Sequence, residues 1–332
     1  MSHELEQHEG KVAFALVGDT AWHGLANAKW DAGTVVSVSE MLEAAFLAKW
    51  NVRTEPWEIP DGYSSDKDYV RIVRTNPFTG TTDILGQALG SYTPAQNEDV
   101  ATFGDALTMG GAYPETAGSI YGGKRIFLSW LLPHGMVLDE SGRADEVKSY
   151  LLVTTSHDGS SSTKALVTPV RTVCRNTLML ALESAKNMVS VRHTKNAPVA
   201  IEDARKTLRI SASYMDAFQR EAQMLIQTDI TNQQAHDIFE RVYPMPDKDA
   251  GKASLTKWET KQDSLWEYYT GSTCENIIGT AWGALNALTE QVDYGTKSRS
   301  AETGLAAAAG FDAARNNKRN EMLAVVKSVA LV

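Results

Sequence analysis

Hydrophobic periodicity divides the chain into a strand-rich first half and a helical second half. Period-two alternation flanked by turn residues predicts a hairpin over residues 68–92, turning at "NPFTG", and a second over residues 147–171, turning at "SHDGSSS". The apolar run "KRIFLSWLLP" predicts a further strand between them. Residues 1–34 show neither period, and we expect them to be irregular.

Helical spacing dominates the rest of the sequence. A first helix is predicted over residues 37–51, with Ser37 or Ser39 as its cap, and the period changes from two to 3.6 at Thr172. A short helix is predicted in "TFGDALTMGGA", and a long helix carries a heptad seam over 201–225. Further helical segments are predicted at 232–243, 255–269, 274–294 and 302–329.

This order of elements predicts an α+β fold, because hairpins are followed by helices instead of alternating with them. We expect an antiparallel sheet of hairpins packed with helices, followed by a helical C-terminal half. The polar, Pro- and Gly-containing stretch "PMPDKDAGK" predicts a boundary between a core domain, residues 1–245, and a helical region, residues 246–332.

Composition places the chain among globular proteins. Of its 332 residues, 43% are hydrophobic and 22% charged, and no apolar run is long enough to cross a membrane. The polar, acidic N-terminus does not match a secretory signal. Cys174 and Cys274 lie in apolar, helix-like surroundings and are predicted to be buried thiols, which favours a reducing cytoplasm.

Charge is distributed unevenly along the chain, which has a formal net charge of −9. Residues 1–159 carry 11 Lys and Arg against 22 Asp and Glu, whereas residues 160–209 carry 9 against 3. A local excess of +6 in an acidic protein is compatible with a polyanionic ligand. The alternative is a solvated basic face that pairs with acidic neighbours in the fold.

The basic residues fall into a stripe if the predicted helix starts near Arg171. Arg171, Arg175 and Lys186 then lie on one side, away from the apolar side. Such a stripe, with cations on the preceding strand and the following loop, is suited to a sugar–phosphate backbone. The candidate nucleic-acid contacts are Lys124, Arg125, Lys164, Arg171, Arg175, Asn176, Lys186, Arg192 and Lys195. Aromatic residues are absent from 160–209, so any base stacking would come from residues elsewhere, such as Tyr121, Phe127 or Trp130.

Motifs of catalysis are weak in this sequence. "GSIYGGKR" lacks the spacing of a phosphate loop and precedes a strand, so it is interpreted as a turn. The histidines and cysteines lack zinc-site spacing. His157 and Asp158 could form a metal or acid/base pair, but such a stretch is more often a turn in which Asp158 bonds the backbone and Gly159 takes a positive φ.

Several motifs together resemble a protein family encoded by phages and plasmids, known as domain of unknown function 932. They are "SHDGSSS", "TPVRTVCRNTLMLAL", "LGQALGSYTPAQNED" and "GTAWGALNALTEQVDYG", and the resemblance runs from about Trp22 to Gly310. In outline, the two hairpins followed by a basic helix are also similar to phage single-strand annealing proteins. That second resemblance implies oligomers that hold DNA in a basic groove.

These observations predict a phage-encoded single-stranded DNA binding or annealing protein that acts in recombination in the host cytoplasm. We expect it to be a homo-oligomer without cofactor or bound metal, and a binding protein more than an enzyme. One alternative is a mobile-element enzyme or host-directed effector with a small polar pocket near His157 and Asp158. Another is a structural protein that self-associates through the 201–225 seam.

Overall fold

The computed structural model describes residues 5–18, 26–58, 61–62, 65–108, 112–133, 135–171, 188–191, 214–247, 249–292 and 313–331. The chain forms two compact units. Unit 1 comprises residues 1–133, 150–168 and 186–212, and unit 2 comprises residues 134–149, 169–185 and 213–332. The predicted α+β class with a helical C-terminal half is confirmed. The expected domain boundary after residue 245 falls inside unit 2 and stays a prediction about separable domains.

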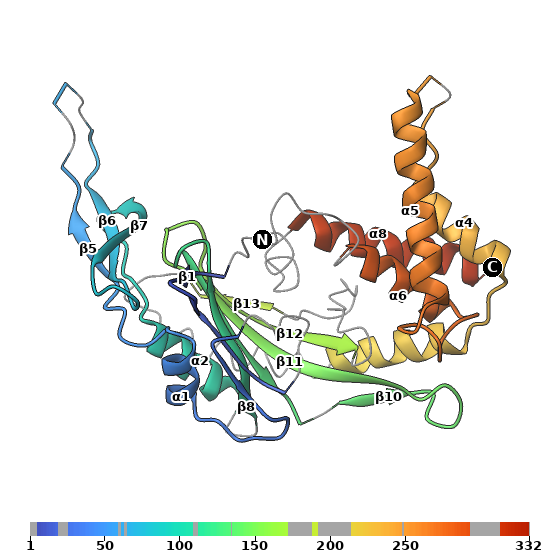
Figure 1. The fold of residues 1–332 in the computed structure, drawn as a ribbon, viewed down its shortest axis with the longest axis horizontal. Helices are drawn as coiled ribbons and strands as arrows, with labels where there is room; N and C mark the ends of the chain where they lie inside the picture. The colour runs from blue at the N-terminus through green and yellow to red at the C-terminus, as the bar shows by residue number, and fades with distance from the viewer. Residues whose placement is uncertain are drawn as a thin grey trace. The chain divides into compact units, whose positions relative to one another are not determined.

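A large mixed sheet carries most of the strands (Figure 1). Its order is β13–β12–β11–β9–β8–β3–β4, with β10 beside β11. The strands are β3 (Phe14–Val17), β4 (Ala28–Trp30), β8 (Tyr113–Ile120), β9 (Arg125–Leu131), β10 (Met136–Leu138), β11 (Asp145–Ser156), β12 (Thr163–Arg171) and β13 (Met188–Val191). The neighbouring strands β11 and β12 form the predicted second hairpin, and β9 is the predicted apolar strand. β10 and the first residues of β11 belong to unit 2.

The expectation that residues 1–34 are irregular is wrong. β1 (Gln7–His8) and β2 (Lys11–Val12) form a small antiparallel pair, and β3 lies inside the large sheet between β8 and β4. Every residue of β3 is buried. A strand that is buried on both faces has no alternation of polar and apolar positions, so periodicity does not reveal it.

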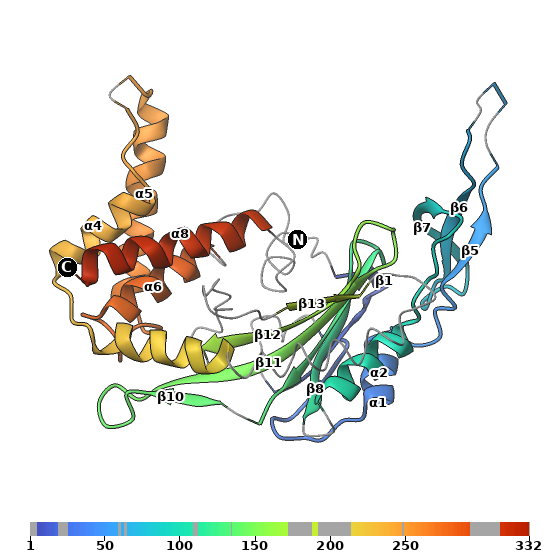
Figure 2. The same cartoon turned by 180° about the vertical axis from the view of Figure 1, so that it is seen from behind.

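A separate three-stranded antiparallel sheet contains the first predicted hairpin. It consists of β5 (Arg53–Pro56), β6 (Tyr69–Thr75) and β7 (Thr82–Leu89). Two helices of unit 1 flank it in sequence, α1 (Val38–Ala44) and α2 (Asn97–Thr108). The Ser37 hydroxyl and Glu40 carboxylate cap α1 reciprocally, so Ser37 is the cap of the two serines that the sequence offered, and the helix ends at Ala44, before its predicted end near residue 51. Figures 1 and 2 show α1 and α2 side by side against the large sheet, where they contact β8 and β9.

A buried ion network connects the three-stranded sheet to the N-terminal segment. Arg74 of β6 is only 1% exposed and binds the carboxylates of Glu6 and Asp83. Its guanidinium carbon lies 4.1 Å from the ring centroid of Trp50. Ser119 of β8 donates a hydrogen bond of 2.9 Å to Glu6, which extends the network to the large sheet. The network therefore joins four segments of unit 1 that are distant in sequence.

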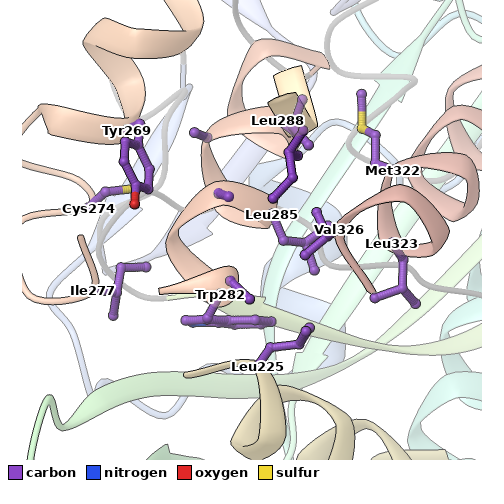
Figure 3. Packing of buried hydrophobic residues seen from close by; sticks show 14 of the residues in the cluster. Leu225, Tyr269, Cys274, Ile277, Trp282, Leu285, Leu288, Met322, Leu323 and Val326 are labelled. Atoms are coloured by element: carbon purple, nitrogen blue, oxygen red, sulfur yellow. The ribbon is translucent and has the colours of Figure 1, made fainter. Parts of the chain in front are cut away.

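Unit 2 is built around α6 (Ala281–Glu290), all of whose residues are buried. Residues 214–227, α4 (Asn232–Val242), α5 (Lys252–Thr270) and α8 (Ala313–Ala330) are helical as well. Figure 3 shows Trp282, Leu285 and Leu288 of α6 among residues of the other helices. Trp282 also donates a hydrogen bond of 2.8 Å from Nε1 to the buried Asp145 carboxylate.

Two helical predictions change in unit 2. α6 does not begin at Cys274, because residues 272–279 form turns and the Thr280 hydroxyl caps the helix by accepting from the Gly283 amide at 2.9 Å. Cys274 is buried, as predicted. Of the long helix expected to carry the 201–225 seam, residues 214–227 are helical, and the remainder lies outside the described residues, as does Cys174. Among the described residues, no helix is long and apolar enough to cross a membrane.

The buried network predicts an unequal response to two arginine substitutions. Replacing Arg74 by alanine leaves Glu6 and Asp83 without their counter-charge, and we expect it to lower the free energy of unfolding by about 3–5 kcal/mol. Arg53→Ala is the control, because Arg53 pairs with Glu55 at 3.0 Å on the surface. Its expected effect is below about 1 kcal/mol. Urea unfolding followed by tryptophan fluorescence measures both, and equal effects would contradict the role given to Arg74.

Candidate nucleic-acid interface

The described residues include four of the nine predicted contact residues. Lys124, Arg125 and Lys164 belong to unit 1. Arg171 is the last residue of β12 and belongs to unit 2. The other predicted contacts lie outside the described residues, namely Arg175, Asn176, Lys186, Arg192 and Lys195. The structure therefore permits a description of the N-terminal part of the expected interface.

The "GSIYGGKR" stretch forms the predicted turn, between β8 and β9. Tyr121, Gly122 and Gly123 all have positive φ values, between 57° and 86°, which two glycines make possible at low cost. The turn leaves Lys124 exposed and places Arg125 first in β9. The Arg125 guanidinium lies 5.5 Å from the Tyr121 ring centroid and donates to the Ser160 hydroxyl at 3.3 Å.

Strand register brings Lys164 and Arg125 to the same face of the large sheet. Arg125 is the cross-strand partner of Ser156, so these two side chains share a face. On the opposite face, the Thr155 and Thr163 hydroxyls form a hydrogen bond of 2.9 Å. Because side chains alternate along a strand, the next residues, Ser156 and Lys164, lie together on the face of Arg125. Two strand spacings and two residues along the strand separate Arg125 from Lys164, which corresponds to about 12 Å between their backbones.

Serine hydroxyls surround the two cations. Ser190 of β13 is the cross-strand partner of Lys164 and bonds the Ser162 hydroxyl at 2.6 Å. Together with Ser160, these hydroxyls provide neutral hydrogen-bonding groups beside the positive charges. We call the set Tyr121, Lys124, Arg125, Ser160, Ser162, Lys164 and Ser190 the turn-end cluster.

The turn between β11 and β12 has the geometry that its sequence predicts. Asp158 Oδ1 accepts a hydrogen bond of 2.9 Å from the Ser160 amide, and Gly159 has a φ of 79°. The turn packs against the three-stranded sheet, because a side chain at Gly86 would overlap the Asp158 backbone. Its position is therefore determined by two sheets of unit 1.

The charge of Arg125 acts on Asp158, an acidic residue of the β11–β12 turn whose pKa is shifted. Burial acts to raise the pKa of Asp158, but hydrogen bonds from Ser160, the charge of Arg125 and a hydrogen bond from Ser156 lower it below the usual value. The opposite effect occurs nearby, since burial and the Asp158 charge raise the pKa of Tyr92 to about 12. Asp158 is thus ionised at neutral pH and offsets part of the Arg125 charge.

His157 lies in the interior instead of a surface pocket. It has 0% exposure, its Nε2 is 2.7 Å from Asn97 Oδ1, and its ring centroid is 5.6 Å from that of Trp50. With Asp158 engaged in the turn, this geometry favours a packed histidine and a turn aspartate over an acid/base pair. Within the described ranges, no group of three or more His, Cys, Asp or Glu is placed to hold a metal ion.

Lys124 and Lys164 are available for an anionic ligand. In the part of the chain that the structure describes, neither lysine forms an ion pair with a carboxylate. Ser190 was missed by the sequence reasoning, because pairing of β12 with a strand 25 residues later has no local signal. Together, the ammonium groups, the guanidinium and the hydroxyls can bind phosphate oxygens without reading a base sequence.

The environment of Asp158 predicts a pH-dependent effect on stability. Because its pKa is lowered on folding, the carboxylate stabilises the protein above its unfolded-state pKa of about 3.9, and this contribution is lost as the pH falls through the folded-state pKa. We expect Asp158→Asn to reduce the free energy of unfolding equally at pH 5 and pH 7, and less below about pH 4. Urea unfolding at each pH measures this, with Ser160→Ala as a milder comparison that retains the backbone donor. A difference that persists unchanged at low pH would contradict it.

Comparison with known proteins gives one match. A family model described as Domain of unknown function (DUF932) matches residues 85–321, which include the end of β7, the turn-end cluster, the helices α4, α5 and α6 and the start of α8. No curated protein and no solved structure matches the chain. The match covers more than half of the sequence and agrees with the resemblance of its motifs, so the chain belongs to the DUF932 family.

Proposed function

We propose that this chain binds single-stranded DNA through its sugar–phosphate backbone and acts as a phage-encoded annealing protein in recombination. It would work as a homo-oligomer in the cytoplasm of the host cell and would need no cofactor. The observation that carries the proposal is the turn-end cluster, in which Lys124, Arg125 and Lys164 lie at one end of one sheet.

Three features of the cluster support a backbone ligand. Its two lysines have no carboxylate partner among the described residues, so no acid of that part of the chain neutralises their charge. Its serine hydroxyls can donate to phosphate oxygens. Its turns are held by backbone geometry and by the packing of Asp158 against β7, which pre-organises the cations. The contacts expected at Arg175, Lys186, Arg192 and Lys195 lie outside the described residues and stay predictions.

The salt dependence of oligonucleotide binding tests the proposal. Each phosphate contact on single-stranded DNA contributes about −0.7 to the slope of log affinity against log salt concentration. Replacing Lys124 and Lys164 by glutamate should weaken binding of a labelled oligo(dT) and reduce the magnitude of the slope by about 1.4. Fluorescence anisotropy across a salt series measures both quantities.

The matched control is the double variant Lys252→Glu and Lys257→Glu. It makes the same change in net charge at two exposed lysines of α5 in unit 2. We expect it to retain the wild-type slope. If both double variants lose affinity equally, the effect is one of net charge and the cluster is not the interface. Absence of any oligonucleotide retention by the wild type at low salt would overturn the proposal.

Annealing is distinguished from binding by a second measurement. The wild type should accelerate pairing of two complementary labelled strands, and light scattering should give a mass well above that of one chain. Binding without acceleration, or a strict monomer, would leave a DNA-binding protein and remove the annealing role.

A further inference from the structure

The solvent face of the three-stranded sheet carries a row of large apolar side chains. Tyr69 of β6 is the cross-strand partner of Leu89 in β7, and the Trp57 amide donates to the Tyr69 carbonyl at 3.2 Å. These three residues therefore form one row across the sheet. They are 37% (Trp57), 36% (Tyr69) and 46% (Leu89) exposed, and Ile84, farther along β7, is 58% exposed.

The row lies on the less buried face of the three-stranded sheet. Ile72 and Arg74 on the opposite face of β6 are buried, and Gly86 packs against the β11–β12 turn, whereas the row's own face is buried at its far end, at Val73. A sheet with one buried face normally presents polar residues on the other. Single exposed apolar residues are common, but a contiguous row that includes tryptophan, tyrosine and leucine is typical of an interaction surface.

The charges around the row determine which class of partner it fits. The loop between β5 and β6 runs from Trp57 to Tyr69, and its described part carries four exposed acids, Glu58, Asp61, Asp66 and Asp68, against one exposed lysine, Lys67. On the row's own face, the next residue of β6 is the partly buried Arg71. Nearer the base of the sheet, the Arg53 guanidinium pairs with Glu55 at 3.0 Å. Phosphates would be repelled by this acidic rim, so stacking of nucleic-acid bases on Trp57 and Tyr69 is disfavoured.

We propose that this face, comprising Trp57, Tyr69, Ile84 and Leu89 with the acidic rim, docks a partner protein through a segment of apolar residues flanked by lysine or arginine. The apolar side chains would cover the row and release its water. The cations would approach the four acids at the rim, where they speed encounter and determine orientation. Trp57 and Tyr69 are the residues expected to contribute most of the affinity. This inference is independent of the DNA-binding proposal, because it concerns a different surface of opposite charge.

The test uses the full chain and a defined probe, a labelled peptide of alternating leucine and lysine. A peptide of alternating leucine and glutamate is the charge control, and oligo(dT) is the nucleic-acid control. We expect the lysine peptide to bind and the glutamate peptide not to bind. The double variant Trp57→Ser and Leu89→Ser, which keeps the net charge, should weaken binding of the lysine peptide by at least about tenfold.

Matched variants separate the apolar row from general effects. Tyr113→Ser removes an exposed aromatic residue of β8 outside the row and should leave peptide affinity unchanged. Asp66→Asn with Asp68→Asn should reduce the salt-dependent part of the affinity without altering the row. Circular dichroism checks that each variant is folded.

Three outcomes would overturn the inference. The first is equal affinity of the lysine peptide for the wild type and the row variant. This result would show that the net negative charge of the protein attracts the peptide and that the row does not bind it. The second is loss of oligo(dT) binding in the row variant, which would make the row a base-stacking surface. The third is a wild-type self-association that the row variant abolishes, which would make a second copy of the chain the occupant.

Discussion

The arrangement of unit 1 depends on one buried arginine. Arg74 binds Glu6 from the N-terminal segment and Asp83 from β7, and it lies over the Trp50 ring. Burial of this guanidinium is tolerated only because both carboxylates satisfy it, and both depend on it in turn. Gly123 belongs to the same constraint, since a side chain there would overlap the Arg74 guanidinium. The turn that presents Lys124 therefore packs directly on the network.

A second constraint operates at the β11–β12 turn. Asp158 organises the turn through its hydrogen bond with the Ser160 amide, while His157 anchors the preceding strand end in the interior through Asn97 of α2. The turn thus contacts a helix, the three-stranded sheet and Arg125 at the same time. Positioning of the cationic cluster and packing of the core are consequently not separable in this part of the protein.

Unit 1 presents two surfaces of different chemistry. The turn-end cluster is cationic and rich in hydroxyls, as a sugar–phosphate backbone requires, whereas the three-stranded sheet is apolar with an acidic rim. The acidic rim disfavours a polyanion at the apolar row, whereas the cationic cluster attracts one. Lys124 and Arg125 come from the acidic segment 1–159 and Lys164 from the basic segment 160–209, so the cationic cluster is a product of the fold and not of one segment.

Local patterns were enough for the α+β class, both hairpins, the start of α1 and the Asp158–Gly159 turn, because each depends on residues a few positions apart. They were not enough for β3, whose four residues are buried on both faces and show no alternation, or for the start of α6, where Thr280 caps the helix after a run of turns. The sequence identified Lys124, Arg125 and Lys164 as candidates. Only the tertiary structure placed them together, because strand register across β9, β11, β12 and β13 decides which side chains share a face, and register is a long-range property.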